Sequence, residues 1–279
     1  MHTPADKGPH TSPTVRIRCF PHRNSRSTAI SLDFYAQFNR RVVFHMQHIE
    51  GYYNYWTVSN NSWTEDADVP IPHTTPDMPY LVALYQNQTA YLPDYEEARA
   101  NGGYDKRTGT YPARMGEVIE IVLQQHGAHI DPAIKGEFDG IPGMLATHPW
   151  HLHGAPFWDA GGGDGAWTPE KAEAQLAGTQ PVRRDTTTVY RYREFTEQGA
   201  PSGWRVWRVR VTQPGVWMMH CHTLPHMVQG MQAVWVHGDA DEVMRLGKPE
   251  LQGYLEFGGD AYGNKTHAPR AIHFSELSS

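Results

Sequence analysis

Hydrophobic and polar residues alternate along several short segments of this chain, which is the pattern of β-strands with one buried face. The clearest segments are 116–123 (GEVIEIVL) and 204–211, where valines alternate with Arg205, Arg208 and Arg210. We interpret these arginines as the solvated side of their strand. Further strands are predicted at 15–19, 27–34, 41–46, 56–58 and 183–190, and short helices at 95–101, 168–176 and 239–246. The pattern predicts an all-β fold with short helices.

Turn residues interrupt this pattern in two places. Residues 64–115 are polar and rich in turn residues, with prolines at 70, 72, 76, 79 and 93 among them, so we expect a long insertion there. The run Gly161–Gly165 (GGGDG) is expected to be a plain loop, because the Gly-Lys-Ser/Thr of a phosphate-binding loop does not follow it. We expect the strand at 116–123 to lie beside the segment 148–153.

The composition supports a globular chain and excludes some partners. The 279 residues allow one or two domains, and 39% hydrophobic residues with nine Trp and fourteen Tyr can fill a sizeable core. A net charge of −6 gives no electrostatic footprint for nucleic acid or for an anionic membrane. The sequence contains no run of eighteen apolar residues, so it predicts no transmembrane helix, and no signal peptide is visible at the start.

Two histidine-rich motifs about 70 residues apart carry the candidate chemistry: HPWHLHG at 148–154 and HCHTLPHMVQGM at 220–231. On a strand, His220 and His222 share one face while Cys221 points to the other, so one tripeptide can contact two metal centres. Cys221, His226, a second imidazole from the first motif and Met231 supply the His₂Cys set with a weak axial thioether that is typical of blue-copper sites. Zinc is the alternative metal, but a structural zinc site needs only four of these ligands.

Together with the stretch QPGVW at 213–217, the two motifs resemble the C-terminal cupredoxin domain of multicopper oxidases, in the ascorbate oxidase and laccase group. The resemblance covers about 210 residues, from near Ser27 to about Gly238, and implies a cupredoxin-like Greek-key β-sandwich. Position by position, it implies that the type 1 copper has His148, Cys221 and His226 as equatorial ligands and Met231 as axial ligand, that His151 is a type 2 copper ligand, and that His153, His220 and His222 are type 3 copper ligands.

The resemblance also implies a mechanism that this chain holds only in part. In the family, a reducing substrate gives single electrons to the type 1 copper, and His220-Cys221-His222 passes them to a trinuclear site that reduces O₂ to water. That site takes four His-X-His pairs, whereas this sequence has the two pairs His151/His153 and His220/His222. The motifs HMQH at 45–48 and HGAH at 126–129 have their histidines three apart, so on a strand these would face opposite sides, and we interpret them as structural or surface histidines.

The resemblance divides the chain into three parts. Residues 1–27 are expected to be a lead-in, the tail of a preceding cupredoxin domain. Residues 28–240 are expected to be the C-terminal cupredoxin domain with the type 1 copper and half of the trinuclear site, and 241–279 a tail. The four missing histidines would come from N-terminal cupredoxin domains or from another chain. We expect a phenolic, enediol or aromatic-metabolite substrate; the alternative is an incomplete, non-catalytic blue-copper module for electron transfer or metal binding.

Three sequons and one unpaired cysteine bear on the cellular location. Cys19 has no partner once Cys221 is a ligand, and it is either a buried small hydrophobe or, as occurs in the family, part of an inter-domain disulfide. The sequons at Asn60, Asn87 and Asn264 are compatible with glycosylation. We expect a secreted or secretory-pathway protein if the full-length chain carries a signal.

Overall fold

The computed structural model describes six stretches of the chain, namely residues 37–64, 70–75, 80–85, 92–131, 140–178 and 180–245. All of them belong to a unit that begins at Gln37. The strands predicted at 15–19 and 27–34 lie outside the described residues, as do Cys19, Asn87 and Asn264.

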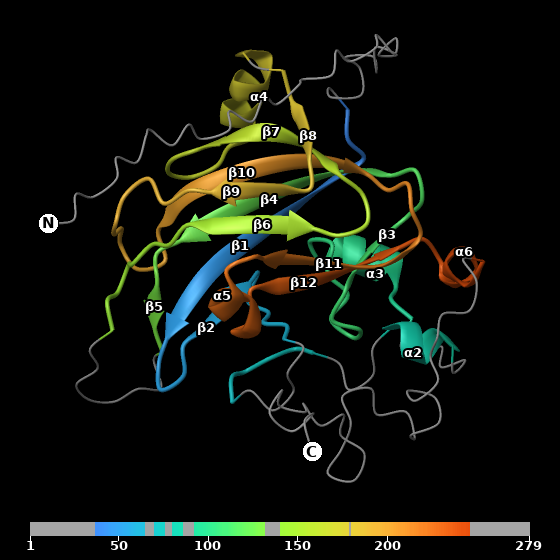
Figure 1. Cartoon of the computed structure of the whole chain (residues 1–279), viewed down its shortest axis with the longest axis horizontal. Helices are drawn as coiled ribbons and strands as arrows, with labels where there is room; N and C mark the ends of the chain where they lie inside the picture. The colour runs from blue at the N-terminus through green and yellow to red at the C-terminus, as the bar shows by residue number, and fades with distance from the viewer. Residues whose placement is uncertain are drawn as a thin grey trace, which may run out of the picture. The chain divides into compact units, whose positions relative to one another are not determined.

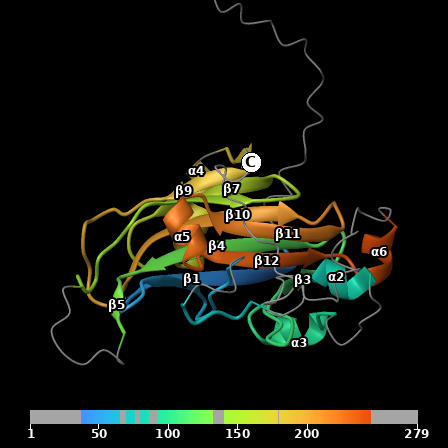
Figure 2. The same cartoon turned by 60° about the horizontal axis from the view of Figure 1, so that its bottom comes forward.

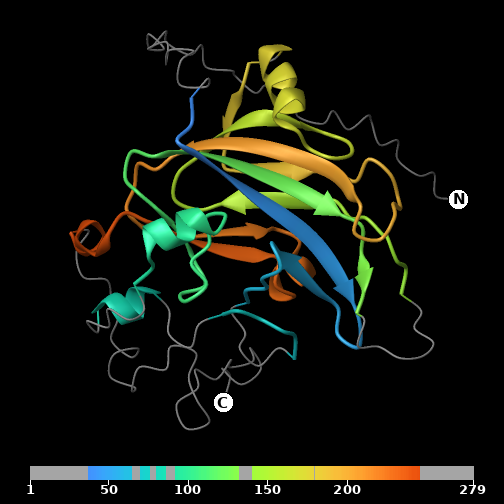
Figure 3. The same cartoon turned by 180° about the vertical axis from the view of Figure 1, so that it is seen from behind.

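The larger of two sheets has seven strands and is mixed. Its order is β2 (Tyr55–Val58), β1 (Arg40–Glu50), β4 (Val118–His126), β10 (Pro201–Arg210), β7 (Phe157–Gly163) and β8 (Val182–Arg184), with β5 (His129–Ile130) also beside β1. The pairs β1–β4 and β1–β5 are parallel and the others antiparallel. Figure 3 shows β1 (blue) as the long strand beside β4 (green), with β10 (orange) on the other side of β4.

The smaller sheet has five strands and carries both histidine-rich motifs. Its order is β3 (Tyr111–Ala113), β12 (Gln232–His237), β11 (Gly215–Cys221), β6 (His148–Leu152) and β9 (Thr186–Val189). The first motif lies on β6 and the second begins at the end of β11, and these strands are antiparallel neighbours (Figure 1).

The hydrophobic core lies between the two sheets. Alternate residues of β1, Val42, Phe44 and Met46, are buried in the same cluster as Trp150 of β6 and Trp235 of β12. The Phe44 ring lies 6.5 Å from Trp150 and 6.1 Å from Trp235, which are contacts across the sandwich. The cupredoxin-like, all-β sandwich that the sequence predicts is therefore confirmed.

The helices are short and lie outside the sheets (Figure 2). Helices α2 (Tyr80–Tyr85) and α3 (Tyr95–Ala100) belong to the insertion between β2 and β4, and α4 (Pro169–Gly178), α5 (Leu224–Val228) and α6 (Ala240–Met244) follow in the described part of the chain. The predicted helices at 95–101, 168–176 and 239–246 correspond to α3, α4 and α6. In the part of the chain that the structure describes, no helix has the length and apolar composition needed to cross a membrane.

The expectation that the β10 arginines face solvent is wrong for two of them. Arg208 is only 1% exposed, and its guanidinium donates to the buried carboxylate of Glu120 at 2.7 and 2.8 Å. Arg205 donates to Asp159 of β7 at 2.8 Å. A buried guanidinium requires a paired carboxylate, and these partners come from neighbouring strands, so the alternation in β10 alone could not reveal them.

Two further expectations about strands near the site are wrong. The strand at 116–123 corresponds to β4, but it pairs with β1 and β10 rather than with β6, and it is buried on both faces. Gly161–Gly163 belong to strand β7 instead of a loop. A Cβ at Gly162 would lie 2.5 Å from the Trp204 carbonyl oxygen, so glycine permits β7 to approach β10 closely.

The predicted strand at 183–190 is divided between the two sheets. Val182–Arg184 form β8 at the edge of the larger sheet, and Thr186–Val189 form β9 at the edge of the smaller one. The change of sheet occurs at Asp185, beside His151 of the first motif.

Candidate metal centre

Three side chains from separate elements meet inside the sandwich: His148, Cys221 and His226. His148 begins β6 and Cys221 ends β11, and the β6–β11 ladder holds these strand ends side by side through the pair Cys221↔Trp150. After Cys221 the chain turns into α5, whose N-cap residue is Thr223. This turn brings His226 back to the sulfur.

The three ligand atoms form a compact triangle. The Cys221 Sγ atom lies 3.8 Å from His148 Nδ1 and 3.7 Å from His226 Nδ1, and the two nitrogens are 3.2 Å apart. Metal–sulfur and metal–nitrogen bonds of about 2.3 and 2.0 Å in a trigonal plane would separate sulfur from nitrogen by about 3.7 Å and the nitrogens by about 3.5 Å. The triangle therefore has the size that one metal ion needs.

Burial keeps both imidazoles of this triangle neutral. It lowers the pKa of His148 well below the usual value, with further lowering by the neighbouring His226 and His48, and it also lowers the pKa of His226. A neutral imidazole offers a lone pair to a metal. Burial raises the pKa of the Cys221 thiol. Hydrogen bonds with the backbone and side chain of Thr223 lower this pKa and partly offset the effect of burial. Since a thiol binds metal as the thiolate, metal binding here would release a proton.

Met231 lies in the same buried cluster as Cys221 and is 0% exposed. Its backbone N–H donates to the His226 carbonyl at 2.9 Å, and its carbonyl accepts from the Cys221 N–H at 3.1 Å. Two ligand residues of the triangle thus fix the backbone of Met231. Among the described residues, His148, Cys221 and His226 are the three that bring ligand atoms within 4.8 Å of one another, which is one donor short of a four-ligand structural zinc site.

Residues outside the two motifs complete the surroundings of the triangle. The Trp56 ring of β2 lies 4.7 Å from His148 and 4.8 Å from His226, and it stacks on His48 at 4.6 Å. The amide nitrogen of Gln125 lies 3.2 Å from His148 Nε2. The sequence analysis missed Trp56 and Gln125, because neither has a motif of its own and both come from the other sheet.

The other four histidines of the motifs gather where β6 and β11 pair, around the cross-strand pair His220↔His151, and His151 points away from the core that contains Trp150 and Leu152. The His151 ring lies 4.9 Å from His153, 5.6 Å from His220 and 6.1 Å from His222. His153 Nε2 and His220 Nε2 are 3.2 Å apart. We call these four residues the four-histidine group; two of its members, His153 and His222, are exposed.

Backbone carbonyls orient two of these imidazoles. His151 Nδ1 donates to the Asp185 carbonyl at 2.9 Å, and His220 Nδ1 donates to the Cys221 carbonyl at 3.0 Å. The Nε2 atom of each ring then carries the lone pair, which is a common arrangement of metal-binding histidines.

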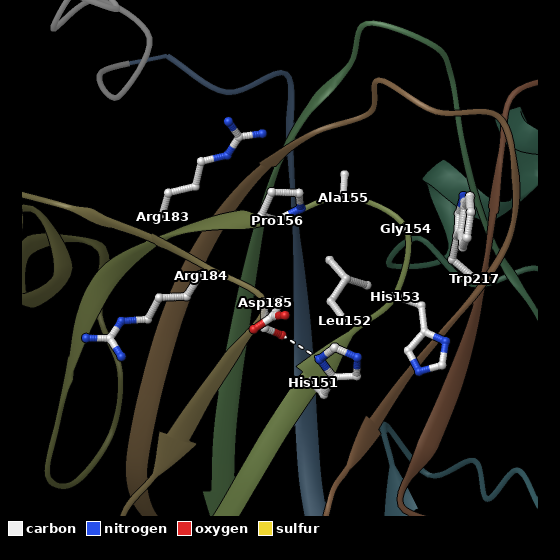
Figure 4. Close-up of a pocket in the computed structure, with 10 residues that line it drawn as sticks. All are labelled: His151, Leu152, His153, Gly154, Ala155, Pro156, Arg183, Arg184, Asp185 and Trp217. Atoms are coloured by element: carbon white, nitrogen blue, oxygen red, sulfur yellow. Dashed lines mark hydrogen bonds between the residues drawn. The ribbon is translucent and has the colours of Figure 1, made fainter. Parts of the chain in front are cut away.

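An open pocket of about 650 Å³ adjoins the four-histidine group. Figure 4 shows His151 and His153 on one side of it, with Trp217 beside His153, while the side chains of Arg183 and Arg184 point away from His151. Gly154 has a φ of +87°, and a Cβ there would lie 2.6 Å from the Trp217 ring. Glycine at this position therefore lets the chain turn directly after His153.

Comparisons with known proteins agree with the resemblance of the motifs. Residues 71–241, more than half of the chain, match the family model described as multicopper oxidase. The chain is 42% identical over 222 residues to Laccase-like multicopper oxidase 1 of Thermothelomyces thermophilus, a match that covers 78% of this chain and 32% of that protein. It is 40% identical over 238 residues to Multicopper oxidase terE of Aspergillus terreus, with 78% and 41% covered.

More distant matches include an L-ascorbate oxidase of Cucurbita pepo var. melopepo, which is 29% identical over 216 residues, with 73% of this chain and 33% of that protein covered. The crystal structure of a laccase from Botrytis aclada aligns with a TM-score of 0.45 at 17% identity and covers 70% of this chain and 28% of that one. The chain thus spans between 32% and 41% of the length of these curated relatives.

Proposed function

Because the chain belongs to the multicopper oxidase family, we propose that it forms the part of a copper-dependent oxidase that holds a type 1 copper and half of a trinuclear copper site. The observation that carries this proposal is the triangle of Cys221 Sγ with the Nδ1 atoms of His148 and His226, at 3.8 and 3.7 Å. Three donors of this kind, with a methionine in the same cluster, favour copper over zinc.

We assign eight residues to copper in this proposal. His148, Cys221 and His226 would hold the type 1 ion with Met231 as axial ligand, His151 would contribute to type 2 copper, and His153, His220 and His222 to type 3 copper. Bound copper would supply one-electron oxidation of a donor and the reduction of O₂ to water. The chain's own contribution is to exclude water from Cys221, to keep the imidazoles neutral, and to join the two groups covalently, since Cys221 is bonded through the backbone to His220 and His222.

The remaining parts of the assembly follow from the same proposal. Residues 28–240 would be the C-terminal cupredoxin domain, preceded by the tail of another such domain at 1–27 and followed by a tail at 241–279. Four further histidines would come from N-terminal cupredoxin domains or from another chain. The donor would be a phenol, an enediol or an aromatic metabolite. If it carries a signal, the complete protein would be secreted or in the secretory pathway, with Asn60 as an exposed candidate for glycosylation.

The second candidate function is a non-catalytic blue-copper or metal-binding module. The buried triangle alone would suffice for that role, but the four-histidine group would then have none. The oriented Nε2 atoms of His151 and His220 therefore favour the oxidase.

Copper counting separates the two functions. The chain is reconstituted with copper, with and without the N-terminal domains of a relative, and its visible absorption and bound copper are measured. The oxidase proposal expects one tightly bound copper and a blue colour in the chain alone, and additional tightly bound copper after the domains are supplied. A colourless copper-loaded chain would contradict the type 1 assignment, and an unchanged copper count would favour the electron-transfer module.

A further inference from the structure

A separate pair of histidines lies on the outer face of the larger sheet. His45 is on β1 and His126 ends β4, two strands that are parallel neighbours. Since Phe44 and Met46 on either side of His45 are buried in the core, the His45 side chain points away from the core and is exposed. His126 is half-buried. This pair belongs to the two motifs that we interpreted as structural or surface histidines.

The two imidazoles turn ring nitrogens toward each other. His45 Nδ1 lies 3.0 Å from His126 Nε2, and the ring centroids are 5.2 Å apart. The other nitrogen of His126, Nδ1, donates to the Gly199 carbonyl at 2.9 Å. His126 therefore carries its proton on Nδ1 and directs the lone pair of Nε2 at His45.

The backbone around both residues is fixed. Gly127 N–H donates to the Ala200 carbonyl, and Gly199 N–H donates to the Gly127 carbonyl, both at 3.0 Å, so the acceptor for His126 is held in place. The carbonyl of His45 accepts from Ser59 N–H at 2.8 Å. A carbonyl that fixes the tautomer and orientation of an imidazole is the usual support of a metal-ligating histidine.

We propose that His45 Nδ1 and His126 Nε2 form a surface binding site for a cupric ion, separate from the copper sites assigned above. Two nitrogens about 2.0 Å from a metal are about 2.8 Å apart at a 90° angle and about 3.3 Å apart at a tetrahedral angle. The observed 3.0 Å is closer to the right angle of a tetragonal Cu²⁺ site, which takes nitrogen and oxygen ligands. Water would occupy the remaining positions, so the ion would be exchangeable.

The neighbouring His129 provides a matched control. Its Nδ1 accepts from the Gln198 side-chain amide at 2.9 Å, so its proton lies on Nε2 and neither nitrogen offers a free lone pair. Burial lowers the pKa of His45 and of His126, so both stay neutral and able to bind at neutral pH.

The test uses the copper-reconstituted protein in four forms: unchanged, His45→Ala, His126→Ala and His129→Ala. Added Cu²⁺ is followed by equilibrium dialysis and by electron paramagnetic resonance. The unchanged protein and His129→Ala should bind one further equivalent with a tetragonal signal, and His45→Ala and His126→Ala should bind it at least about tenfold more weakly. None of these substitutions changes a residue assigned to the other copper sites, so blue absorption should be the same in all four forms. Weaker binding of the further equivalent can therefore be told apart from a failure of the type 1 assignment.

Crystals soaked with Cu²⁺ give an independent readout, namely an anomalous peak between His45 Nδ1 and His126 Nε2. Because His45 is exposed, His45→Ala should fold even if His126→Ala does not. Retention of the further equivalent by folded His45→Ala would overturn the proposal, as would the absence of the anomalous peak, and the pair would then be a histidine–histidine hydrogen bond alone.

Discussion

Cys221 and His222 are adjacent in the chain but lie in contrasting surroundings: Cys221 is fully buried, whereas His222 is exposed. Around Cys221, every donor of the triangle comes from this chain and is held by β6, β11 and α5. In the four-histidine group, to which His222 belongs, His151 and His153 line an open pocket. The difference teaches that ligands which project into the core can form a complete donor set from one sandwich, whereas the donors of an open, surface-facing group can be supplemented by another domain.

The largest expected effect is on the colour of the copper-loaded protein. Cys221→Ser removes the thiolate and should abolish the blue absorption entirely, because the remaining imidazoles do not form a copper–thiolate bond. His222→Ala, the matched change one residue later, should leave the absorption in place. Visible spectra of both variants at equal copper content check this prediction, and a blue Cys221→Ser protein would contradict it.

Oxygen consumption should require more histidines than the four-histidine group contains. The isolated chain, reduced by a phenol or by ascorbate, should consume O₂ at a negligible rate, because four imidazoles can hold at most part of a three-copper cluster. Supplying the N-terminal domains should restore consumption, which an oxygen electrode measures. Robust consumption by a verified monomer of the chain, lost in His220→Ala, would show that this chain completes the cluster by itself.

Copper retention against a chelator should differ between variants of the buried triangle and variants of the four-histidine group. His148→Ala removes a ligand of the buried triangle and should weaken the tightly bound copper of the isolated chain by at least about tenfold. His153→Ala changes the exposed group and should leave that copper unaffected. Dialysis against a graded series of chelator concentrations gives both affinities. Equal losses in the two variants would mean that the tight copper is not in the triangle.

His237, a buried histidine outside the triangle and the four-histidine group, tests how burial of an imidazole affects stability. Burial lowers the pKa of His237 to about 4, with an opposing hydrogen bond to the Gln213 backbone. Between pH 6.5 and about 4 the unfolded chain therefore binds a proton that the folded chain refuses, so stability is complete above pH 6.5 and falls as the pH decreases. The loss from this residue is about 3 kcal/mol.

Urea unfolding of the metal-free chain at pH 7 and pH 4.5 gives the free energy of unfolding at each pH, and comparison with His237→Gln isolates the part that comes from His237. His237→Gln should make the free energy of unfolding less dependent on pH than in the unchanged chain. An unaltered pH dependence would show that His237 is protonated in the folded state or that it opens readily to water.

The smallest expected effect is at Met231. Met231→Leu should keep a blue, copper-loaded protein and raise the reduction potential, because axial ligation in such sites is weak and tunes the potential rather than holding the metal. Redox titration of the visible band gives the potential. If it does not change, Met231 is not the axial ligand.

The strand pattern of the sequence was sufficient for the fold class but not for the surroundings of individual strands. The alternation of valines and arginines in β10 correctly indicated a strand, yet the pairing of Arg208 with Glu120 joins positions 88 residues apart. The glycines at 161–163 resembled a loop, because the close approach of Gly162 and Gly163 to Trp204 is visible only in the folded sheet. In both cases the missing information was the identity of a neighbour distant in sequence.

For the candidate metal centre, the sequence by itself determined which residues are available and on which side of a strand they lie. The His-Cys-His spacing places Cys221 and its flanking histidines on opposite faces, because side chains alternate along a strand. Only the tertiary structure decided that His148, 73 positions from Cys221, comes within 3.8 Å of the sulfur. That distance depends on the β6–β11 ladder and on the turn into α5, and the contacts of Trp56 and Gln125 with His148 depend on the packing of the two sheets.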